Sequence, residues 1–570
     1  MDKEKKQGIT RRSFLKNTAA SAGAIAATGA GLLAGENASA QSASSSPASS
    51  AEATKYPWQK TYSWETPPAA IPDSKLKEKV TADIIVVGFG IAGATAALSA
   101  SDEKAKVVLL EKWELYNCRG SDNAAIDSSL QKKAGVKLDK DEICLALQKY
   151  AGNRSDQRLL RLWANNSGRI IDWLGGITEQ HGIKLKLAFK NRNWPKYPEG
   201  QEPDKEWHKE FNVCHYFTGR QPGLMFALEK EIRKRGIEVR YQTRAVQLIR
   251  KDKGRVTGVI AQDKDGNYVQ FNANKGVILS TGEYGHDEEM MEKYCPWAAE
   301  TAKTTSPYTP PVNTGDGHKM AMWVGGVMEP GPHPPVDHSG GGPLAASAFL
   351  HVNTLGERYE NEDVTCQLLS NSMKRQPGKT FWQVYDSKWK DEVDKMGIGL
   401  LMYGDPSSSP APESEGTYPI ATPPPPAGKT VQANNITDLA RKMGVPVDTF
   451  KATIDRYNEL CALGKDLDFG KRADRMMPVN KPPYYAGDAV IAFLVVLGGL
   501  YVNTRLQLLD SDRKPIEGIY LTGNTIGNRF ANDYGTMTSG ATHGFAWTTG
   551  FLSAKSALGV KDPAWEPAKA

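Results

Sequence analysis

The sequence predicts an α/β fold whose main domain is assembled from both ends of the chain. Residues 83–111 contain a glycine motif between two short apolar runs. Two more strand-like runs follow much later in the chain: residues 276–282 end in Thr-Gly, and residues 515–524 end in Thr-Gly-Asn. Continuous apolar runs are typical of strands buried on both faces in parallel sheets covered by helices. Because the run at 515–524 is far along the chain from the run at 276–282, the segment between these two runs is expected to form an inserted lobe.

The glycine motif predicts a Rossmann-like dinucleotide site. Gly88 permits a tight turn, Gly90 lets the backbone approach a pyrophosphate, and Gly93 lets the helix pack closely on the strand. The N–H groups of the helix N-terminus then point at the phosphates. Glu111 ends the second apolar run, where an acid accepts a ribose hydroxyl about 20 residues after the glycines. The alternative is a structural glycine turn that binds no ligand.

The first 40 residues resemble a Tat-type export signal. Arg11 and Arg12 precede an Ala/Gly-rich apolar stretch at 18–35 and an Ala-Ser-Ala sequence at 38–40. A transmembrane anchor is the alternative, but the stretch is too short and too rich in Ala and Gly for a bilayer span of about 20 residues. We therefore expect export to the periplasm or the extracytoplasmic face of the membrane, a linker at 41–77, and no stable membrane span after cleavage.

Composition describes a large protein of ordinary polarity, with 40% hydrophobic and 24% charged residues. Six basic and three acidic residues lie in 1–40, so this segment accounts for +3 of the net charge of +6. No basic stripe is interleaved with aromatic residues, which argues against a nucleic-acid partner. The six cysteines form neither CxxC nor CxxCH, which excludes a c-type haem attachment and gives no zinc or iron–sulfur spacing. One disulfide is possible outside the cytoplasm.

The remaining patterns divide the chain into domains. Strands are expected at 237–249 and 255–261, and two amphipathic helices at 436–463, broken at Gly-Val-Pro. A Pro/Ser-rich surface loop is expected at 407–429. The predicted organisation is a nucleotide domain built from 78–290 and 480–557, with a capping domain at 291–479.

Several motifs in a fixed order resemble the fumarate reductase/succinate dehydrogenase flavoprotein superfamily, which includes flavocytochrome-type fumarate reductases, urocanate reductase and 3-ketosteroid dehydrogenases. They are the glycine motif with Glu111, VILSTG before Glu283, TFKATIDRYNELCALGKDLDFGK, NKPPYYA, and GIYLTGN followed by GATHGFAWTTG. The resemblance covers about residues 78–557. It implies an FAD-binding Rossmann-like domain of the glutathione-reductase type with an inserted α+β capping domain. It also implies hydride transfer between flavin N5 and one carbon of a C=C or CH–CH bond, with a protein acid or base serving the other carbon.

The resemblance also assigns the residues that would contact FAD. The pyrophosphate and ribose would be held by the three motif glycines and Glu111, and the isoalloxazine would lie beside 121–129. The remaining candidates are Ser121, Asn123 and Ser128 in that segment, Val246 at the adenine, and Gly282, Gly523, Asn524 and Gly540 along the cofactor. Membrane-complex members bond the flavin covalently to a histidine in the segment matching 118–128, which here contains no histidine. Noncovalent FAD is therefore expected.

The sequence departs from the fumarate reductase pattern at two positions. The family's proton-donating arginine falls on Cys366, and a substrate-binding histidine falls on Val495. We expect a substrate larger and less charged than fumarate. Tyr534, which resembles a catalytic tyrosine of ketosteroid dehydrogenases, is the candidate proton donor, and a phenol stays protonated at neutral pH. Arg529 or His333 would polarise the substrate carbonyl; Arg358 is expected to be an architectural ion-pairing residue.

The predicted function is an exported FAD-dependent reductase of the C=C bond of an α,β-unsaturated carboxylate or enone, serving anaerobic respiration. Electrons would come from a separate c-type cytochrome or a quinol-linked membrane haem protein, because the chain has neither CxxCH nor a nicotinamide motif. Two alternatives remain open. One is a 3-ketosteroid-type dehydrogenase running in the oxidative direction, and the other is an electron-transfer flavoprotein with a vestigial substrate site.

Overall fold

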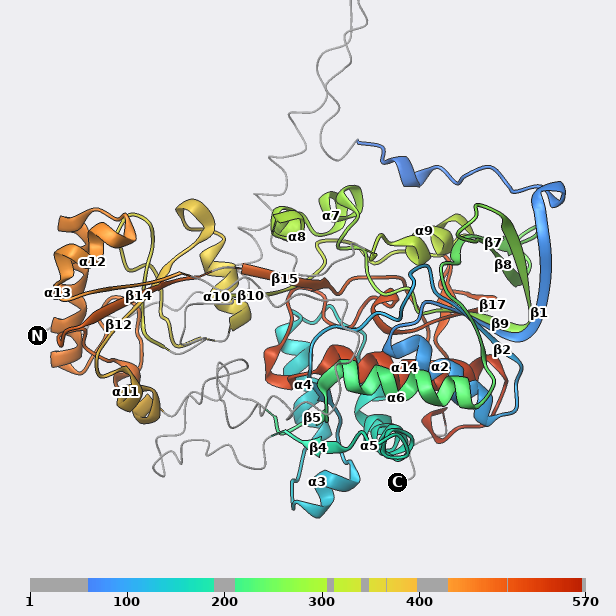
Figure 1. Ribbon diagram of the computed structural model, residues 1–570, viewed down its shortest axis with the longest axis horizontal. Helices are drawn as coiled ribbons and strands as arrows, with labels where there is room; N and C mark the ends of the chain where they lie inside the picture. The colour runs from blue at the N-terminus through green and yellow to red at the C-terminus, as the bar shows by residue number, and fades with distance from the viewer. Residues whose placement is uncertain are drawn as a thin grey trace, which may run out of the picture. The chain divides into compact units, whose positions relative to one another are not determined.

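A computed structural model describes residues 60–188, 211–304, 312–339, 348–364, 366–396, 429–489 and 491–565 (Figure 1). The expected export signal, residues 41–59 of the expected linker, and the Pro/Ser-rich loop up to residue 428 lie outside these ranges. Contacts divide the chain into a unit Met1–Thr61 and a unit Tyr62–Ala570, and only the second is described below.

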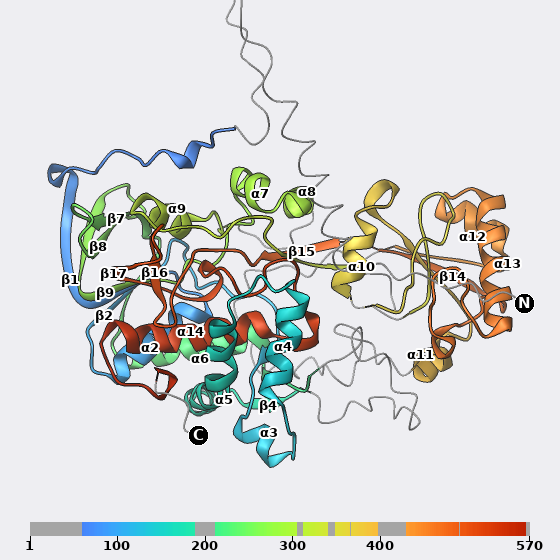
Figure 2. The same cartoon turned by 180° about the vertical axis from the view of Figure 1, so that it is seen from behind.

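The main sheet combines strands from both ends of the chain, as the sequence predicts. Its order is β16-β17-β9-β1-β2-β6, and all neighbours are parallel except β16 and β17 (Figures 1 and 2). The strand bounds are β1 Leu76–Val87, β2 Val107–Leu110, β6 Glu238–Arg240, β9 Tyr268–Leu279, β16 Gln507–Leu509 and β17 Pro515–Leu521. Antiparallel β7 Arg244–Arg250 and β8 Val256–Gln262 extend it through β9, where two strands were expected.

Two helices rich in small residues pack directly on each other beside this sheet. Helix α2 (Ile91–Asp102) follows the glycine motif, and α14 (Ala541–Ala557) ends the described fold. Ser99 Oγ donates to the carbonyl of Phe551 at 2.9 Å, and a Cβ on Gly550 would lie 2.4 Å from the carbonyl oxygen of Ala92. This close approach requires glycine at 550. The C-terminal segment therefore packs against the glycine-motif helix.

Further elements surround these two helices. They are helices α3 Ser129–Lys133, α4 Lys140–Tyr150, α5 Gln157–Glu179 and α6 Arg220–Lys234, and a small sheet of β3 Asn123–Ala124, β5 Cys214–Phe217 and β4 Leu185–Leu187. Helix α5 buries one apolar stripe, as expected for a surface helix that packs on a core. Among the described residues, no helix is both long and apolar enough to cross a bilayer. None of the five cysteines whose side chains are described forms a disulfide.

The inserted segment forms an antiparallel sheet covered by helices, in agreement with the α+β prediction. The strand order is β11-β12-β14-β13, with bounds β11 Leu350–Val352, β12 Trp382–Asp386, β13 Thr430–Ala433 and β14 Tyr484–Asp488. Helices α12 (Ile436–Met443) and α13 (Val447–Leu463) pack on it. They break at Gly444, whose φ of 75° favours glycine, and at Pro446, as the sequence predicts.

Two antiparallel strands flank the sheet of the inserted segment in the sequence, one before it and one after it. These are β10 Pro335–Ser339 and β15 Ile491–Val496, which pair with each other. The other described helices of this region are α7 Glu288–Tyr294, α8 Ala299–Thr304, α9 Asp316–Trp323, α10 Cys366–Met373 and α11 Trp389–Met396. The domain boundaries proposed from the sequence stay a prediction.

The chain from Tyr62 onward differs from the expected linker, because aromatic residues anchor it. Tyr62 and Trp64 are each only 7% exposed. Their rings surround the ammonium of Lys293, which lies 5.3 Å from the Tyr62 centroid and 4.9 Å from that of Trp64. The Trp323 indole donates to the carbonyl of Trp64 at 2.9 Å. Buried aromatic area and cation–π contacts therefore hold this stretch on the domain.

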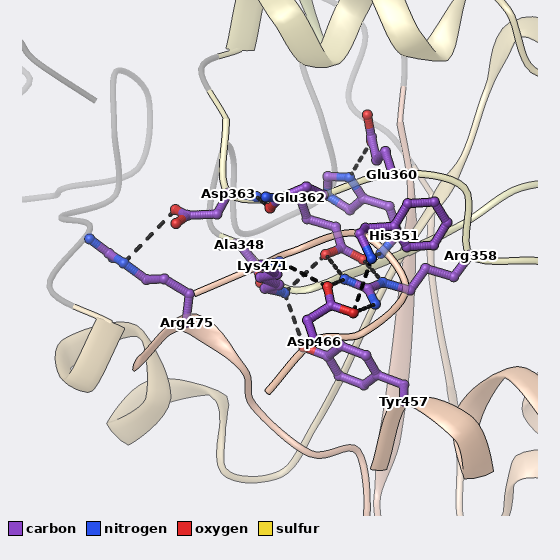
Figure 3. A network of polar contacts seen from close by, with 12 residues as sticks. Ala348, His351, Arg358, Glu360, Glu362, Asp363, Tyr457, Asp466, Lys471 and Arg475 are labelled. Atoms are coloured by element: carbon purple, nitrogen blue, oxygen red, sulfur yellow. Dashed lines mark hydrogen bonds and ion pairs between the residues drawn. The ribbon is translucent and has the colours of Figure 1, made fainter. Parts of the chain in front are cut away.

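Arg358 has the architectural role that the sequence predicts. It pairs with Glu362 at 2.8 Å and with Asp466 at 2.8 Å, and the Lys471 ammonium lies 3.1 Å from Glu362 (Figure 3). Burial raises the pKa of Glu362, but Lys471 and Arg358 outweigh it and lower the value to about 2. Buried charges persist only where they are paired in this way. The network joins the strand-rich and helical parts of the inserted segment.

Candidate active site

A cavity opens at the carboxyl ends of β1, β2, β9 and β17, where ligands bind in open α/β sheets. The space between its walls, counted together with the open solvent at its mouth, is about 1210 Å³. Its walls come from segments spread over most of the chain: 87–92, 110–112, 117–119, Gln221, Met225, 243–245, 280–283, Val312, Asn313, Asp316, Met320, Val495, 522–524, Thr542, His543 and Ala546.

The three motif glycines have three different environments. A Cβ on Gly88 would lie 2.4 Å from the carbonyl oxygen of Ser280, and φ there is +105°. A Cβ on Gly93 would lie 1.9 Å from the carbonyl oxygen of Gly88. A Cβ on Gly90 would find only the Asn117 carbonyl, at 3.8 Å, so it would project into open space at the N-terminus of α2. Gly88 and Gly93 therefore allow close packing, whereas Gly90 leaves a cradle into which a phosphate fits.

Glu111 lines the cavity at the end of β2 and braces the glycine turn. Its Oε2 accepts from the backbone N–H of Phe89 at 2.7 Å and its Oε1 from that of Trp113 at 2.9 Å. Burial raises its pKa, and these two hydrogen bonds oppose that shift. A carboxylate has about four acceptor positions, so both oxygens can still accept ribose hydroxyls.

A largely buried carboxylate, Asp316, contacts the basic side chains at the same end of the cavity. Asp316 Oδ2 accepts from Lys112 at 3.0 Å, and its Oδ1 pairs with Arg244 at 2.8 Å. Burial raises the pKa of Asp316, but the two cations lower it overall to about 2. Sequence reasoning missed this trio because its members lie on β7, on α9 and after β2, and no local motif links them.

A second polar group lies where the segment 117–119 reaches the cavity. Arg119 Nη1 donates to Glu283 Oε1 at 3.1 Å and to the carbonyl of Leu494 at 2.9 Å. Asn313 Nδ2 donates to the same Glu283 oxygen. This group ties the end of β9 to β15 and was also missed, although Glu283 directly follows a motif that the resemblance uses.

Six of the predicted cofactor residues line the cavity: Gly88, Gly90, Glu111, Gly282, Gly523 and Asn524. The segments that hold the others reach it through different residues. Val246 lies in β7, but the wall there is formed by residues 243–245, at the start of that strand. Gly540 is the N-cap of α14 with φ +83°, and the residues of that helix that line the cavity are Thr542 and His543. Gly93 contributes packing, as described above.

The serines and asparagine near residue 125 are engaged within the protein and do not line the cavity. Ser128 caps α3 and its hydroxyl lies 2.7 Å from Nε2 of His215. Asn123 is buried and accepts from Gln221, which does line the wall. The Ser121 hydroxyl donates to Asp122 at 2.8 Å. These contacts are typical of turn and capping chemistry.

The residues of the cavity fit FAD. A glycine cradle at a helix N-terminus suits a pyrophosphate, and a buried acceptor suits a ribose. The wall that contains Arg119, Thr542 and His543 supplies hydrogen-bond donors for the polar edge of the isoalloxazine ring. FAD would thus be held by Gly90, Glu111 and the segments around residues 119 and 542.

Arg529 lies directly behind the wall residue Asn524. It is 1% exposed; its Nε donates to the carbonyl of Ile526 at 3.1 Å and its Nη2 to Asn524 Oδ1 at 3.2 Å. Nη1 is buried and has no hydrogen-bond partner among the described residues. Burial lowers its pKa to about 10 while the charge of Glu329 opposes this, so the guanidinium is charged at neutral pH. The N–H groups of Nη1 thus remain available for an acceptor that no described residue supplies.

Tyr534 lies in an apolar cluster next to this arginine. Its ring packs edge-on to Phe530 at 5.3 Å, and the cluster includes Leu497, Phe545 and, at its margin, Val495. Burial and then Asp122 raise the pKa of the phenol well above its ordinary value, so it is protonated at neutral pH. Val495 lines the cavity and pairs with Val336 across β15 and β10. The wall at the position of the family's histidine is therefore apolar.

His333 does not fit the role that the sequence suggested for it. It is 2% exposed, does not line the cavity, and stacks on Tyr294 at 5.0 Å. Its Nδ1 accepts from the Tyr284 hydroxyl, and its Nε2–H donates to the carbonyl of Glu329 at 3.0 Å. Burial lowers its pKa to about 4. Both nitrogens are occupied, so His333 is a neutral structural residue here. The side chain of Cys366 lies outside the described residues.

Comparison with known proteins agrees with this site. The model of the FAD binding domain family matches residues 83–540. A vinyl phenol reductase of Lactiplantibacillus plantarum is 28% identical over 83% of this chain and 96% of its own length. A 3-oxosteroid 1-dehydrogenase of Mycolicibacterium smegmatis is 30% identical over 83% of this chain and 96% of its own.

The fold also matches a solved flavoenzyme. The open conformation of a flavocytochrome c3 fumarate reductase superposes with a TM-score of 0.61 at 24% identity, covering 88% of this chain and 83% of that one. The chain belongs to the FAD-binding fumarate reductase and 3-ketosteroid dehydrogenase family, and it is an FAD-dependent oxidoreductase that acts on C=C bonds.

Proposed function

We propose that this enzyme reduces the C=C bond of an α,β-unsaturated carboxylate or enone that is larger and less charged than fumarate. The unpaired Nη1 of buried Arg529, next to an apolar cluster that contains Tyr534, carries this proposal. One buried cation suits one carboxylate or carbonyl, whereas a dicarboxylate needs two polar anchors. The name of the vinyl phenol reductase relative supports an aryl alkene as the substrate type.

Each residue has a defined task in the proposed reaction. Arg529 binds the carbonyl or carboxylate oxygen and stabilises the negative charge that develops there. Tyr534 donates the proton to the α-carbon from its phenolic oxygen. Val495 in the cavity wall, backed by the apolar cluster that contains Phe530, excludes water around the double bond and holds an aryl or alicyclic group. FAD, when bound, supplies the hydride for the β-carbon.

The proposal includes the setting of the reaction. FAD is bound without a covalent link, the enzyme is exported, and a separate c-type cytochrome or quinol-linked haem protein reduces it. The twin arginines at 11–12 and the absence of CxxCH and of a nicotinamide motif support this setting.

A second direction of reaction has one specific observation in its favour. The 3-oxosteroid 1-dehydrogenase relative is 30% identical and is named for an oxidation. In that direction Arg529 would hold the ketone oxygen, the phenolate of Tyr534 would accept the proton from the α-carbon, and FAD, when bound, would accept the hydride from the β-carbon.

An anaerobic assay tests the proposal. The purified holoenzyme receives electrons from dithionite-reduced viologen, and its oxidation is followed with fumarate, 4-hydroxycinnamate, 4-vinylphenol and a steroid enone. We expect kcat/KM for 4-hydroxycinnamate or the steroid enone to exceed that for fumarate by 100-fold or more, and to exceed that for 4-vinylphenol, which has no carbonyl for Arg529 to bind. Fumarate as the best substrate, or no turnover with any alkene, would refute the proposed substrate class. Dye reduction by a saturated ketosteroid would instead favour the dehydrogenase.

A further inference from the structure

A single buried carboxylate, Glu329, ties together two distant segments behind the cavity. It is 4% exposed and precedes β10. Its Oε1 accepts from the backbone N–H of Gly499 at 3.0 Å, and its Oε2 accepts from that of Asn528 at 2.8 Å. The backbone N–H of Glu329 donates in return to the carbonyl of Gly499 at 2.9 Å. Both oxygens are used by backbone donors, so Glu329 acts on other residues through the main chain.

The segments that it holds lead directly to Arg529. Asn528 immediately precedes Arg529, and the Nε of Arg529 bonds back to the carbonyl of Ile526. A Cβ on Gly527 would lie 2.4 Å from the carbonyl oxygen of Gly499, so the two main chains are in direct contact there. Closely packed backbone leaves no flexible side chain to absorb a movement. A shift of the Glu329 carboxylate is therefore transmitted to the base of the Arg529 side chain.

The charges of the two groups support the same arrangement. Burial raises the pKa of Glu329 to about 7, and the N–H groups of Asn528 and Gly499, followed by the charge of Arg529, oppose that rise. The charge of Glu329 in turn supports the charged form of Arg529. Among the described residues, no salt bridge joins the two directly. Glu329 thus stabilises the charge of Arg529 without touching it and also holds the backbone at Gly499 and Asn528.

We propose that Glu329 is a positioning residue of the active site, which holds the backbone of residues 526–529 so that the unpaired nitrogen of Arg529 faces the substrate oxygen. This rests on the proposed role of Arg529. Neither the sequence motifs nor the cavity lining identified Glu329, because it contacts neither the cavity nor a motif residue through its side chain.

A double-mutant cycle tests the proposal with the holoenzyme and 4-hydroxycinnamate as the probe. Glu329→Gln keeps the size but presents an amide NH₂ to one of the two backbone N–H groups. We expect it to lower kcat/KM by about 10- to 100-fold in the native background and by less than about threefold when Arg529 is already alanine, since coupled residues are not additive. Glu392→Gln, which removes another buried carboxyl, in α11, is the matched control and should leave kcat/KM unchanged within about twofold.

A second measurement separates this proposal from the proposed function. Hydrogen exchange of the peptide covering 523–530 should be faster in Glu329→Gln than in the native enzyme and unchanged in Glu392→Gln. Equal losses of kcat/KM with and without Arg529, or unchanged exchange, would overturn the role of Glu329. If the native enzyme does not reduce 4-hydroxycinnamate, the steroid enone replaces it as the probe; if it reduces neither, the proposed function fails and the exchange result alone decides about Glu329. If Glu329→Gln does not retain FAD, Glu329→Asp, which keeps the charge, takes its place in both measurements.

Discussion

Gly90 and Gly93 lie three residues apart, yet alanine should affect different properties at the two positions: FAD binding at Gly90 and the stability of the fold at Gly93. At Gly90 an added Cβ meets only the Asn117 carbonyl, at 3.8 Å, and the backbone is extended with φ −93°, so the apoprotein accommodates it. Alanine in place of glycine at an N-cap costs about 1 kcal/mol. At Gly93 the Cβ would lie 1.9 Å from the carbonyl oxygen of Gly88, a backbone atom that cannot move without opening the turn. Overpacking of this kind costs about 1–3 kcal/mol or more.

The same methyl group at Gly90 occupies the cradle for the pyrophosphate. Losing one or two charge-assisted hydrogen bonds from the helix N-terminus costs about 1.5–3 kcal/mol each. Gly90→Ala should therefore weaken FAD binding by about 10- to 100-fold or more while the apoprotein keeps its Tm within a few degrees. Thermal unfolding of the apoprotein and titration of FAD by fluorescence quenching measure the two quantities. Native FAD affinity in Gly90→Ala, or an apo Tm as low as that of Gly93→Ala, would refute the assignment.

Four further outcomes are expected. Tyr534→Phe should lose about 10²–10⁴-fold in turnover and still bind FAD, because it removes only the proton of the general acid; a near-native rate in the viologen assay would show that the proton comes from elsewhere. Acid precipitation of the holoenzyme should release all flavin into the supernatant, and NADH alone should not sustain turnover; flavin fluorescence on the denatured chain or rapid NADH oxidation would contradict these two expectations. The pKa of Glu362 falls from 4.5 to about 2 on folding, so its ion pairs contribute fully above pH 4.5 and are lost as the pH falls toward 2. The Tm advantage of the native enzyme over Glu362→Gln should shrink over that range, and a constant difference in calorimetry would argue against the network.

Local patterns in the sequence were sufficient for the glycine turn and Glu111 at the cofactor cavity, and for the helix break at Gly444 in the inserted segment. Each depends on residues close together in the chain, and the structure has all three. Contacts between distant segments were not accessible in this way. Lys112, Arg244 and Asp316 meet only because β7, β2 and α9 converge at one end of the cavity.

Burial explains why His333 and the aromatic anchor were misjudged. His333 lies beside prolines in a loop-like sequence. In the structure its ring stacks on Tyr294, and its Nδ1 accepts a hydrogen bond from the Tyr284 hydroxyl. Tyr62 and Trp64 follow a Ser/Ala-rich stretch, and their burial depends on Lys293, far along the chain. Side-chain identity alone does not reveal whether a polar group is already satisfied.

The polarity of the substrate follows from how many buried charges the site leaves without a protein partner. Arg119, Lys112 and Arg244 all bond to carboxylates of the chain, at Glu283 or Asp316. Arg529 differs, because no carboxylate of the described residues forms an ion pair with it, and its Nη1 has no hydrogen-bond partner among them. An unsatisfied buried donor costs about 1–3 kcal/mol, or more when charged, and a substrate oxygen would remove that penalty on binding. With Val495 at the position of the family's histidine, a second substrate carboxylate would lie against an apolar wall and lose its hydration without compensation. For these reasons we propose an alkene with one polar end and one apolar end as the substrate.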